Sequence, residues 1–188
     1  MIPKIIHYCW FGSKNPPAHQ MKYINGWKRL MPNYSFVCWN EKNSPMHLPY
    51  MQTAYENRKW ANLSNLTRLH VLAEFGGIYL DTDIEVLKPF DPLLQDRLFL
   101  GFEDPYVDWE GCINNAVIGA TPQHWFVKKM YDCLLNKING LEEAHLSSPN
   151  LTSSLLKAEG VNEYGEQAIK DIHLYPTDYF YPYSWHQI

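Results

Sequence analysis

The stretch that decides the fold is Phe75-Gly76-Gly77-Ile78-Tyr79-Leu80-Asp81-Thr82-Asp83, followed by Ile84-Glu85-Val86-Leu87-Lys88-Pro89-Phe90-Asp91. Gly76 and Gly77 come after a helical pattern, as glycines do just past a helix C-terminus. Residues 78–80 form a short apolar run of the size of a buried strand, and residues 84–87 resume the apolar run. The order helix, glycines and buried strand therefore places two aspartates at the end of a strand.

Asp81 and Asp83 are two residues apart. Side chains two apart on an extended backbone point to the same face, so we expect the two carboxylates to face the same way. Mg²⁺ and Mn²⁺ are typically held by one or two carboxylates together with substrate phosphates. Because an acidic pair between apolar runs is costly to bury without a partner, the pattern predicts a metal–phosphate site. Asp-x-Asp alone is a weak motif, so a second interpretation stays open, in which both aspartates are turn formers between two strands.

Apolar periodicity predicts the other elements. Strands are expected at residues 4–10, 34–39, 78–80, 98–102, 113–120 and 172–175, and helices at residues 18–30, 50–58, 60–75, 123–136, 141–145 and 151–159. Helix 60–75 is the clearest, because apolar residues recur every three positions from Trp60 to Leu72. This alternation of strands and helices predicts an α/β fold with a mostly parallel central sheet flanked by helices.

Composition excludes several classes of protein. A chain of 188 residues with 46% apolar and 19% charged residues suits one globular domain. The net charge of −4 gives no support to nucleic-acid binding. The four cysteines form no Cys-x-x-Cys pair, which excludes the common zinc and redox motifs and favours reduced thiols in a cytoplasmic protein. The N-terminal apolar run is broken by Pro3 and His7, so we expect no signal peptide, and no apolar run approaches the roughly 20 residues of a membrane span.

Five blocks of the chain resemble one known family. They are residues 2–12, 61–68 and 76–83, with weaker echoes at 114–120 and 172–182. Together they resemble the glycosyltransferases of family 32, which have a sugar-binding region with an Asp-x-Asp motif and include the yeast initiating mannosyltransferase type and bacterial capsular-polysaccharide transferases. More distantly they are similar to the glucosylating clostridial toxins. The resemblance implies a GT-A type nucleotide-diphospho-sugar transferase fold and a Mn²⁺- or Mg²⁺-dependent transfer, with retention of configuration, from a UDP- or GDP-linked sugar to a glycan or polysaccharide acceptor.

The resemblance also assigns roles near the two aspartates. It implies that Asp83 is a direct metal ligand, that Asp81 binds the metal or the ribose, and that Arg68 adds positive charge near the sugar diphosphate. The family has Ser-Asp followed three residues later by Arg, and the acid and the arginine contact the donor sugar. Ser64 and Arg68 match this pattern, but Asn65 stands in place of the aspartate and keeps one acceptor while losing the charge. Alternatively, Arg68 is simply a solvated helix residue.

Three further residues are candidates for the donor site. Trp10 and Phe11 follow the first expected strand, and ligands commonly bind at the carboxyl edge of an α/β sheet. The resemblance implies that both grip the donor nucleotide by stacking on its base, although Trp10 could equally belong to the core. By the same resemblance Asn115 lies near the donor sugar and the acceptor. The acidic, aromatic segment 103–111 is expected to be a loop over the site, as functional loops commonly are.

The length of the chain and the family resemblance also bear on domain organisation and cellular location. We expect a single domain over residues 1–188. The family has a C-terminal segment in which paired histidines and tryptophans help to hold the diphosphate or metal, and no matching segment is found here, so either the chain is a fragment or the metal site is completed otherwise. A lipid-linked acceptor would bring the protein to the inner face of the membrane.

A metal-dependent phosphohydrolase or nucleotidyltransferase is a competing function, with Asp104 and Asp108 as extra carboxylates. A non-catalytic nucleotide-sugar binder is another, suggested by Asn65.

Overall fold

The computed structural model describes residues 1–12, 15–103 and 113–183. Its strands are β1 (Ile5–Cys9), β2 (Ser35–Trp39), β3 (Gly77–Leu80), β4 (Leu98–Phe102), β5 (Ile113–Ala120), β6 (Gln167–Ile169) and β7 (Ile172–Tyr175). Its α-helices are α1 (Ala18–Leu30), α2 (Pro49–Glu56), α3 (Trp60–Phe75), α4 (Trp125–Lys137), α5 (Pro149–Ala158) and α6 (Thr177–Phe180). Two short 3₁₀ helices, η1 (Asp91–Gln95) and η2 (Ala144–Ser147), complete the described elements.

The strands form one sheet in the order β2-β1-β3-β5-β4-β7-β6. Of the seven described strands, five run in the same direction, and β5 and β6 run the other way. β5 is antiparallel to both of its neighbours, β3 and β4, and β6 is antiparallel to β7. Three of the six neighbouring pairs are therefore antiparallel, and the sheet is mixed. The α/β class is confirmed, but the alternation of strands and helices along the chain did not reveal the reversed direction of β5.

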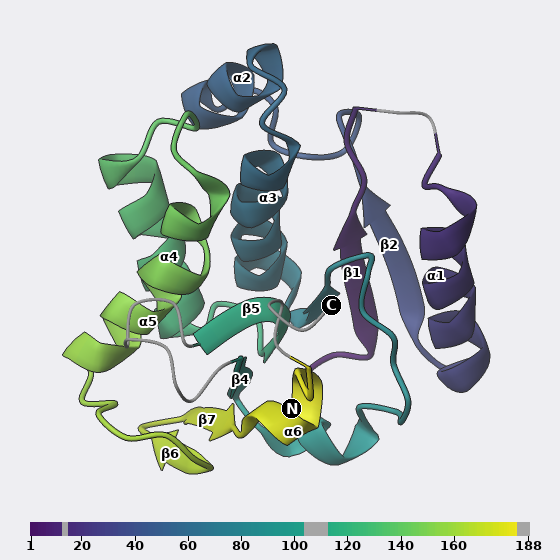
Figure 1. Ribbon diagram of the computed structural model, residues 1–188, viewed down its shortest axis with the longest axis vertical. Helices are drawn as coiled ribbons and strands as arrows, with labels where there is room; N and C mark the ends of the chain where they lie inside the picture. The colour runs from purple at the N-terminus through teal and green to yellow at the C-terminus, as the bar shows by residue number, and fades with distance from the viewer. Residues whose placement is uncertain (13–14, 104–112, 184–188) are drawn as a thin grey trace.

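Helices cover both faces of the sheet. Figure 1 shows α1 and α3 on opposite sides of β1 and β2, with α4 and α5 beyond α3. The two faces have separate apolar clusters. One contains Leu63, Leu66 and Leu69 of α3, and the other contains Ile24 and Trp27 of α1. The apolar residues that recur along residues 60–75 therefore form the face by which α3 packs onto the sheet, as the sequence predicts.

The glycine pair between α3 and β3 is required by the backbone. Gly76 and Gly77 have φ angles of +62° and +103°, which L side chains rarely adopt. A Cβ on Gly76 would lie 2.5 Å from Pro122, and one on Gly77 would lie 2.7 Å from the carbonyl oxygen of Ile5. The pair therefore lets α3 end beside the first residues of β1, and β3 then runs parallel to β1.

Most predicted elements lie within a residue or two of the observed ones. Residues 18–30, 60–75, 98–102, 113–120 and 172–175 have the predicted bounds. The helix expected at residues 141–145 is wrong, because a 3₁₀ helix forms at Ala144–Ser147 instead, and β6 was not predicted. None of the described helices has the length and apolar character needed to cross a membrane.

Candidate active site

A cleft of about 600 Å³ opens at the carboxyl ends of β1 and β3. Three parts of the chain line it. The first, which we call the strand wall, consists of Cys9, Trp10, Phe11, Gly12, Tyr79, Asp81, Thr82 and Asp83. The second is α3, with Trp60, Ala61, Ser64, Asn65 and Arg68. The third, which we call the loop wall, is the segment of residues 140–149, of which Ala144, His145, Ser148 and Pro149 line the cleft; Asn114 of β5 completes the lining. In Figure 1, α3 stands between β1 and α5, the helix that follows the loop wall.

Both aspartates of the Asp-x-Asp motif line this cleft. The strand ends at Leu80, and the backbone N–H of Ile84 donates to the carbonyl oxygen of Asp81 at 3.2 Å, which closes a turn. Residues 84–87 form no strand. The turn interpretation and the site interpretation are thus compatible, because the turn, rather than strand alternation, brings Asp83 to the same cleft as Asp81.

Arg68 links Asp81 to the rest of the cleft. Its Nη2 donates to Oδ1 of Asp81 at 2.7 Å. Its Nη1 donates to Oδ1 of Asn115 and, at 3.1 Å, to Oγ of Ser148. The guanidinium also lies 4.4 Å from the ring centre of Tyr79, whose hydroxyl donates to Asp81 at 3.0 Å. With a side chain only 3% exposed, Arg68 is a buried cation paired with Asp81 and is not a solvated helix residue; among the described residues its Nε has no hydrogen-bond partner.

The two aspartates of the motif have different charged neighbours and different exposure to solvent. Asp81 lies directly against the Arg68 guanidinium, and its side chain is 34% exposed. Asp83 is exposed at the rim, yet the surrounding cleft reduces its hydration and so raises its pKa, and the charge of Asp81 raises it further. Burial alone lowers the pKa of Arg68, but Asp81 and then Tyr79 raise it, and the net shift is upward. A positive charge beside Asp83 would therefore favour its ionised form.

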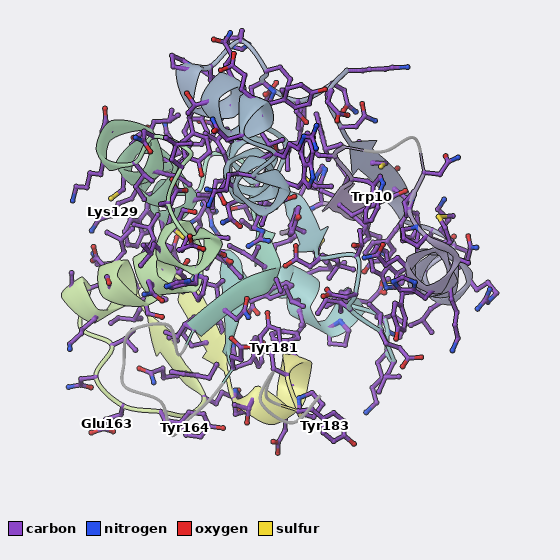
Figure 2. The ribbon with its side chains drawn as sticks, turned by 45° about the horizontal axis from the view of Figure 1, so that its top comes forward. Trp10, Lys129, Glu163, Tyr164, Tyr181 and Tyr183 are labelled. Carbon is purple, nitrogen blue, oxygen red and sulfur yellow. The ribbon has the colours of Figure 1, made fainter. Side chains whose placement is uncertain are left out.

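The other end of the cleft is aromatic. Figure 2 shows Trp10 at the end of β1, where it follows the last strand residue, Cys9. Phe11 is buried, and Trp60, at the start of α3, packs so closely on Gly12 that a Cβ there would lie 2.7 Å from its ring. Gly12 has a φ of +81°. This close approach lets Trp60 share the cleft with Trp10 and Phe11.

The polar candidates on α3 and β5 have different environments. Ser64 lines the cleft, and its hydroxyl donates to the carbonyl oxygen of Trp60 at 3.2 Å. Asn65 also lines the cleft, but its amide nitrogen donates to the loop wall, to Ala144 O at 2.9 Å and Ser147 Oγ at 3.0 Å. Asn115 is 2% exposed and lies behind Arg68 rather than in the cleft. Successive strand residues face opposite ways, so its neighbour Asn114 is the one that lines the cleft.

The structure thus brings seven predicted site residues to one cleft, namely Trp10, Phe11, Ser64, Asn65, Arg68, Asp81 and Asp83. Sequence reasoning missed Trp60, which was assigned to the apolar stripe of the helix, and Tyr79, which was counted as part of an apolar strand. It also missed the loop wall, which carries no motif and begins more than 50 residues beyond the aspartates. Burial of the Tyr79 hydroxyl next to Asp81 could not be inferred from spacing alone.

The oxygen ligands at the turn suit a hard divalent cation. Within residues 1–12, 15–103 and 113–183, no group of three or more His, Cys, Asp or Glu side chains could hold a metal ion. Asp81 and Asp83 are two carboxylates in one cleft, the number that commonly binds Mg²⁺ together with substrate phosphates. Asp104 and Asp108, the extra carboxylates of the phosphohydrolase alternative, and loop 104–111 lie outside the described residues.

Comparison with known proteins points to one kind of chemistry. Residues 17–100 match the family described as glycosyltransferase sugar-binding region containing DXD motif. The chain is 28% identical over 134 residues to mannosyl phosphorylinositol ceramide synthase SUR1 of Saccharomyces cerevisiae, a match that covers 69% of this chain and 34% of that protein. It is 31% identical over 124 residues to lactosylceramide 4-alpha-galactosyltransferase of Rattus norvegicus, which covers 65% of this chain and 32% of that protein. The chain thus spans about a third of the length of these relatives.

A solved structure supports the fold. The PaToxG glycosyltransferase superposes with a TM-score of 0.65 at 20% identity, covering 85% of this chain and 69% of that one. The family match contains Ser64, Asn65, Arg68, Asp81 and Asp83 but ends before the loop wall. The sequence likeness and the geometry therefore coincide on α3 and on the turn after β3.

Proposed function

Because residues 17–100 of this chain match the glycosyltransferase sugar-binding regions that contain a DXD motif, we propose that the protein transfers a sugar from a nucleotide-sugar donor to a glycan-type acceptor. The observation that carries the proposal is the meeting of Asp81, Asp83 and the buried Arg68 in one cleft at the carboxyl ends of β1 and β3. A cleft of about 600 Å³ lies within the range of small-molecule sites, roughly 300–1,000 Å³.

The side chains of the cleft match the base and the diphosphate of a nucleotide-sugar. Aromatic side chains at Trp10, Phe11 and Trp60 offer faces on which a base can stack, and the carboxylates offer oxygen ligands for the cation that accompanies a diphosphate. A Mn²⁺ or Mg²⁺ ion held by Asp83, with Asp81, would supply positive charge to the leaving diphosphate. The raised pKa of Asp83 fits a cation site, because a bound cation would offset the loss of hydration that mainly raises it and would also relieve the repulsion from Asp81.

The residues of the chain then have distinct tasks. In the transfer, the bond between the sugar carbon and the diphosphate oxygen breaks, and the oxygen of an acceptor hydroxyl bonds that carbon while its proton passes to the leaving diphosphate, on which negative charge accumulates. Arg68 donates to Asp81, Asn115 and Ser148, so we assign it the task of orienting Asp81 and of placing positive charge beside the diphosphate. Retention of configuration is implied by family resemblance, and no side chain of the cleft is assigned here as a nucleophile.

The acceptor belongs to the same proposal. The resemblance suggests a glycan or polysaccharide, whereas the names of two relatives refer to ceramide-linked substrates. We therefore propose an acceptor hydroxyl on a glycan, carried either on a polysaccharide or on a lipid at a membrane surface. An acceptor panel with both kinds of carrier separates the two.

The first test is a thermal-shift and calorimetry screen with UDP-glucose, UDP-galactose and GDP-mannose, with and without Mn²⁺. We expect Mn²⁺-dependent binding in the wild type and its loss in Asp83→Asn, while the unfolding midpoint without ligand changes little because Asp83 is exposed. Glu85→Gln is the matched control, since it removes one negative charge from the same exposed segment without touching the cleft. Full Mn²⁺-dependent binding in Asp83→Asn would contradict the metal site.

Product analysis decides between the alternatives. A glycosyltransferase releases nucleoside diphosphate from the donor, whereas a phosphohydrolase that cleaves the diphosphate with water releases nucleoside monophosphate and sugar phosphate. A binder of nucleotide-sugars shows Mn²⁺-dependent binding with none of these products. Release of nucleoside monophosphate and sugar phosphate without nucleoside diphosphate would overturn the proposed reaction.

A further inference from the structure

Three polar side chains recur at every third position of α3 and are almost completely buried. Asn62, Asn65 and Arg68 are 1%, 5% and 2% exposed. Residues three apart are neighbours on a helix surface, so the three form one row. Each of them donates hydrogen bonds to the loop wall. Asn62 bonds Gly140 O and Glu142 O, Asn65 bonds Ala144 O and Ser147 Oγ, and Arg68 bonds Ser148 Oγ. The row therefore follows the loop wall from its start to its end.

Asn65 and Arg68 both line the cleft and bond cleft-lining residues of the loop wall, and of these two Asn65 is the neutral side chain, whose amide donates to that wall. Its amide nitrogen donates to Ala144 O at 2.9 Å and to Ser147 Oγ at 3.0 Å. A carbonyl oxygen can only accept, so the contact with Ala144 requires a hydrogen on residue 65. An ionised aspartate has no such hydrogen and would place negative charge against that carbonyl oxygen. The amide is therefore the chemically required group at this position.

The loop wall has little backbone structure of its own. Its regular structure is the single 3₁₀ turn of η2, and Ser147 and Ser148 are buried while His145 is exposed in the cleft. The strand wall already offers surfaces for a base and a diphosphate, through its aromatic side chains and its carboxylates. The loop wall bonds Arg68 through Ser148, and Arg68 bonds Asp81. We therefore assign to the loop wall the part of the donor that is attached beyond the diphosphate, which is the sugar.

We propose that Asn65 is a positioning residue that holds the loop wall in place through its amide, and that the wall so placed selects the sugar of the nucleotide-sugar. This inference rests on the proposed glycosyl transfer. It predicts that aspartate at position 65 weakens sugar recognition, although the charge at this position is what the family pattern contains. The amide at position 65 is thus part of how this chain builds its donor site.

The test compares three variants with the wild type. Asn65→Ala removes the donor, Asn65→Asp removes it and adds a charge, and Asn57→Asp makes the same exchange at an exposed asparagine whose amide bonds its own helix. Calorimetry with Mn²⁺ measures binding of the best nucleotide-sugar of the panel and of its free nucleoside diphosphate. Losing a buried hydrogen bond predicts an approximately tenfold loss of nucleotide-sugar affinity in Asn65→Ala, a larger loss in Asn65→Asp, and less than about threefold for the free diphosphate. Equal losses for both ligands, or tighter nucleotide-sugar binding by Asn65→Asp, would overturn the selection of the sugar.

Amide hydrogen exchange tests the positioning role without any ligand. We expect faster exchange at residues 144–148 in Asn65→Ala and Asn65→Asp than in the wild type, and wild-type exchange in Asn57→Asp. Unchanged exchange at these residues would overturn the positioning role. If the wild type binds no nucleotide-sugar, the proposed function fails and the sugar selection with it, while the exchange result still decides whether Asn65 holds the wall. Asn65→Ala introduces no charge and keeps the test available if Asn65→Asp does not fold.

Discussion

The two walls of the cleft are built in different ways. The strand wall continues directly from β1 and β3, which pair with each other and with β2 and β5 through backbone hydrogen bonds. Asp81 itself donates its backbone N–H to Ala116 O of β5 at 2.9 Å. The loop wall has one 3₁₀ turn and is held against α3 by the side chains of Asn62, Asn65 and Arg68.

This difference predicts which wall of the cleft is more sensitive to side-chain substitution. Backbone ladders do not depend on side-chain identity, so the strand wall should tolerate loss of a single polar group. The loop wall depends on a few buried donors, and a buried acceptor left without its partner costs more than the hydrogen bond was worth. Side-chain substitutions should therefore damage the loop wall more than the strand wall.

Arg68→Met has the largest expected effect, because Arg68 is bonded to both walls, to Asp81 on one and to Ser148 on the other. Removing one partner of a buried ion pair typically costs about 3–5 kcal/mol, and the partial exposure of Asp81 favours the lower end. We expect the free energy of unfolding, measured in urea, to fall by about 3 kcal/mol, with loss of Mn²⁺-dependent donor binding.

The control for this substitution is Arg97→Met. Arg97 is exposed, and its Nε lies 3.9 Å from Asp171, so we expect a change of less than about 1 kcal/mol. If Arg68→Met were as stable as Arg97→Met, the link between the two walls would carry no stability.

Asn62→Ala probes the loop wall away from the cleft. Two backbone carbonyls, Gly140 O at 3.1 Å and Glu142 O at 3.0 Å, lose their donor. We expect the free energy of unfolding to fall by about 2 kcal/mol, since unsatisfied buried acceptors cost roughly 1–3 kcal/mol. Asn62, Gly140 and Glu142 do not line the cleft, so nucleotide-sugar affinity should fall less than it does in Asn65→Ala.

Asn136→Ala is the matched control for this variant. Asn136 is exposed, and its amide bonds Asp132 O within α4, so we expect a change within about 0.5 kcal/mol. A larger loss of sugar affinity in Asn62→Ala than in Asn65→Ala would show that the loop wall acts as one rigid unit rather than through its cleft-lining part.

The comparison of the walls also explains what the sequence could predict. The strand wall arises from local signals, namely the glycine pair, the apolar run 78–80 and the aspartates, and each of these is contiguous in the chain. The bounds of α3 follow from its apolar repeat and from Gly76. Strand direction is different, because the reversal of β5 is decided by its neighbours β3 and β4 and leaves no mark on its own apolar pattern.

The loop wall could not be predicted because its partners are far away in the chain. Asn65 and Ala144 are 79 residues apart, and the hydrogen bond between them depends on how η2 packs against α3. The sequence shows that Asn65 stands where the family has aspartate, but it does not show which atom of the amide is used. Burial of Asn65 beside a carbonyl oxygen turns an apparent loss of charge into a gain of a donor.

Tyr79→Phe gives the smallest expected effect and the sharpest test of the comparison. The Tyr79 hydroxyl donates to Asp81 at 3.0 Å, but Asp81 keeps Arg68 as a partner and is exposed enough for water to replace the lost donor. The ring stays under the guanidinium, so its packing with Arg68 is preserved. We expect the free energy of unfolding to fall by about 1 kcal/mol or less, compared with Tyr55→Phe as an exposed control. A loss larger than that of Asn62→Ala would show that the strand wall also depends on single side chains, and the contrast between the walls would not hold.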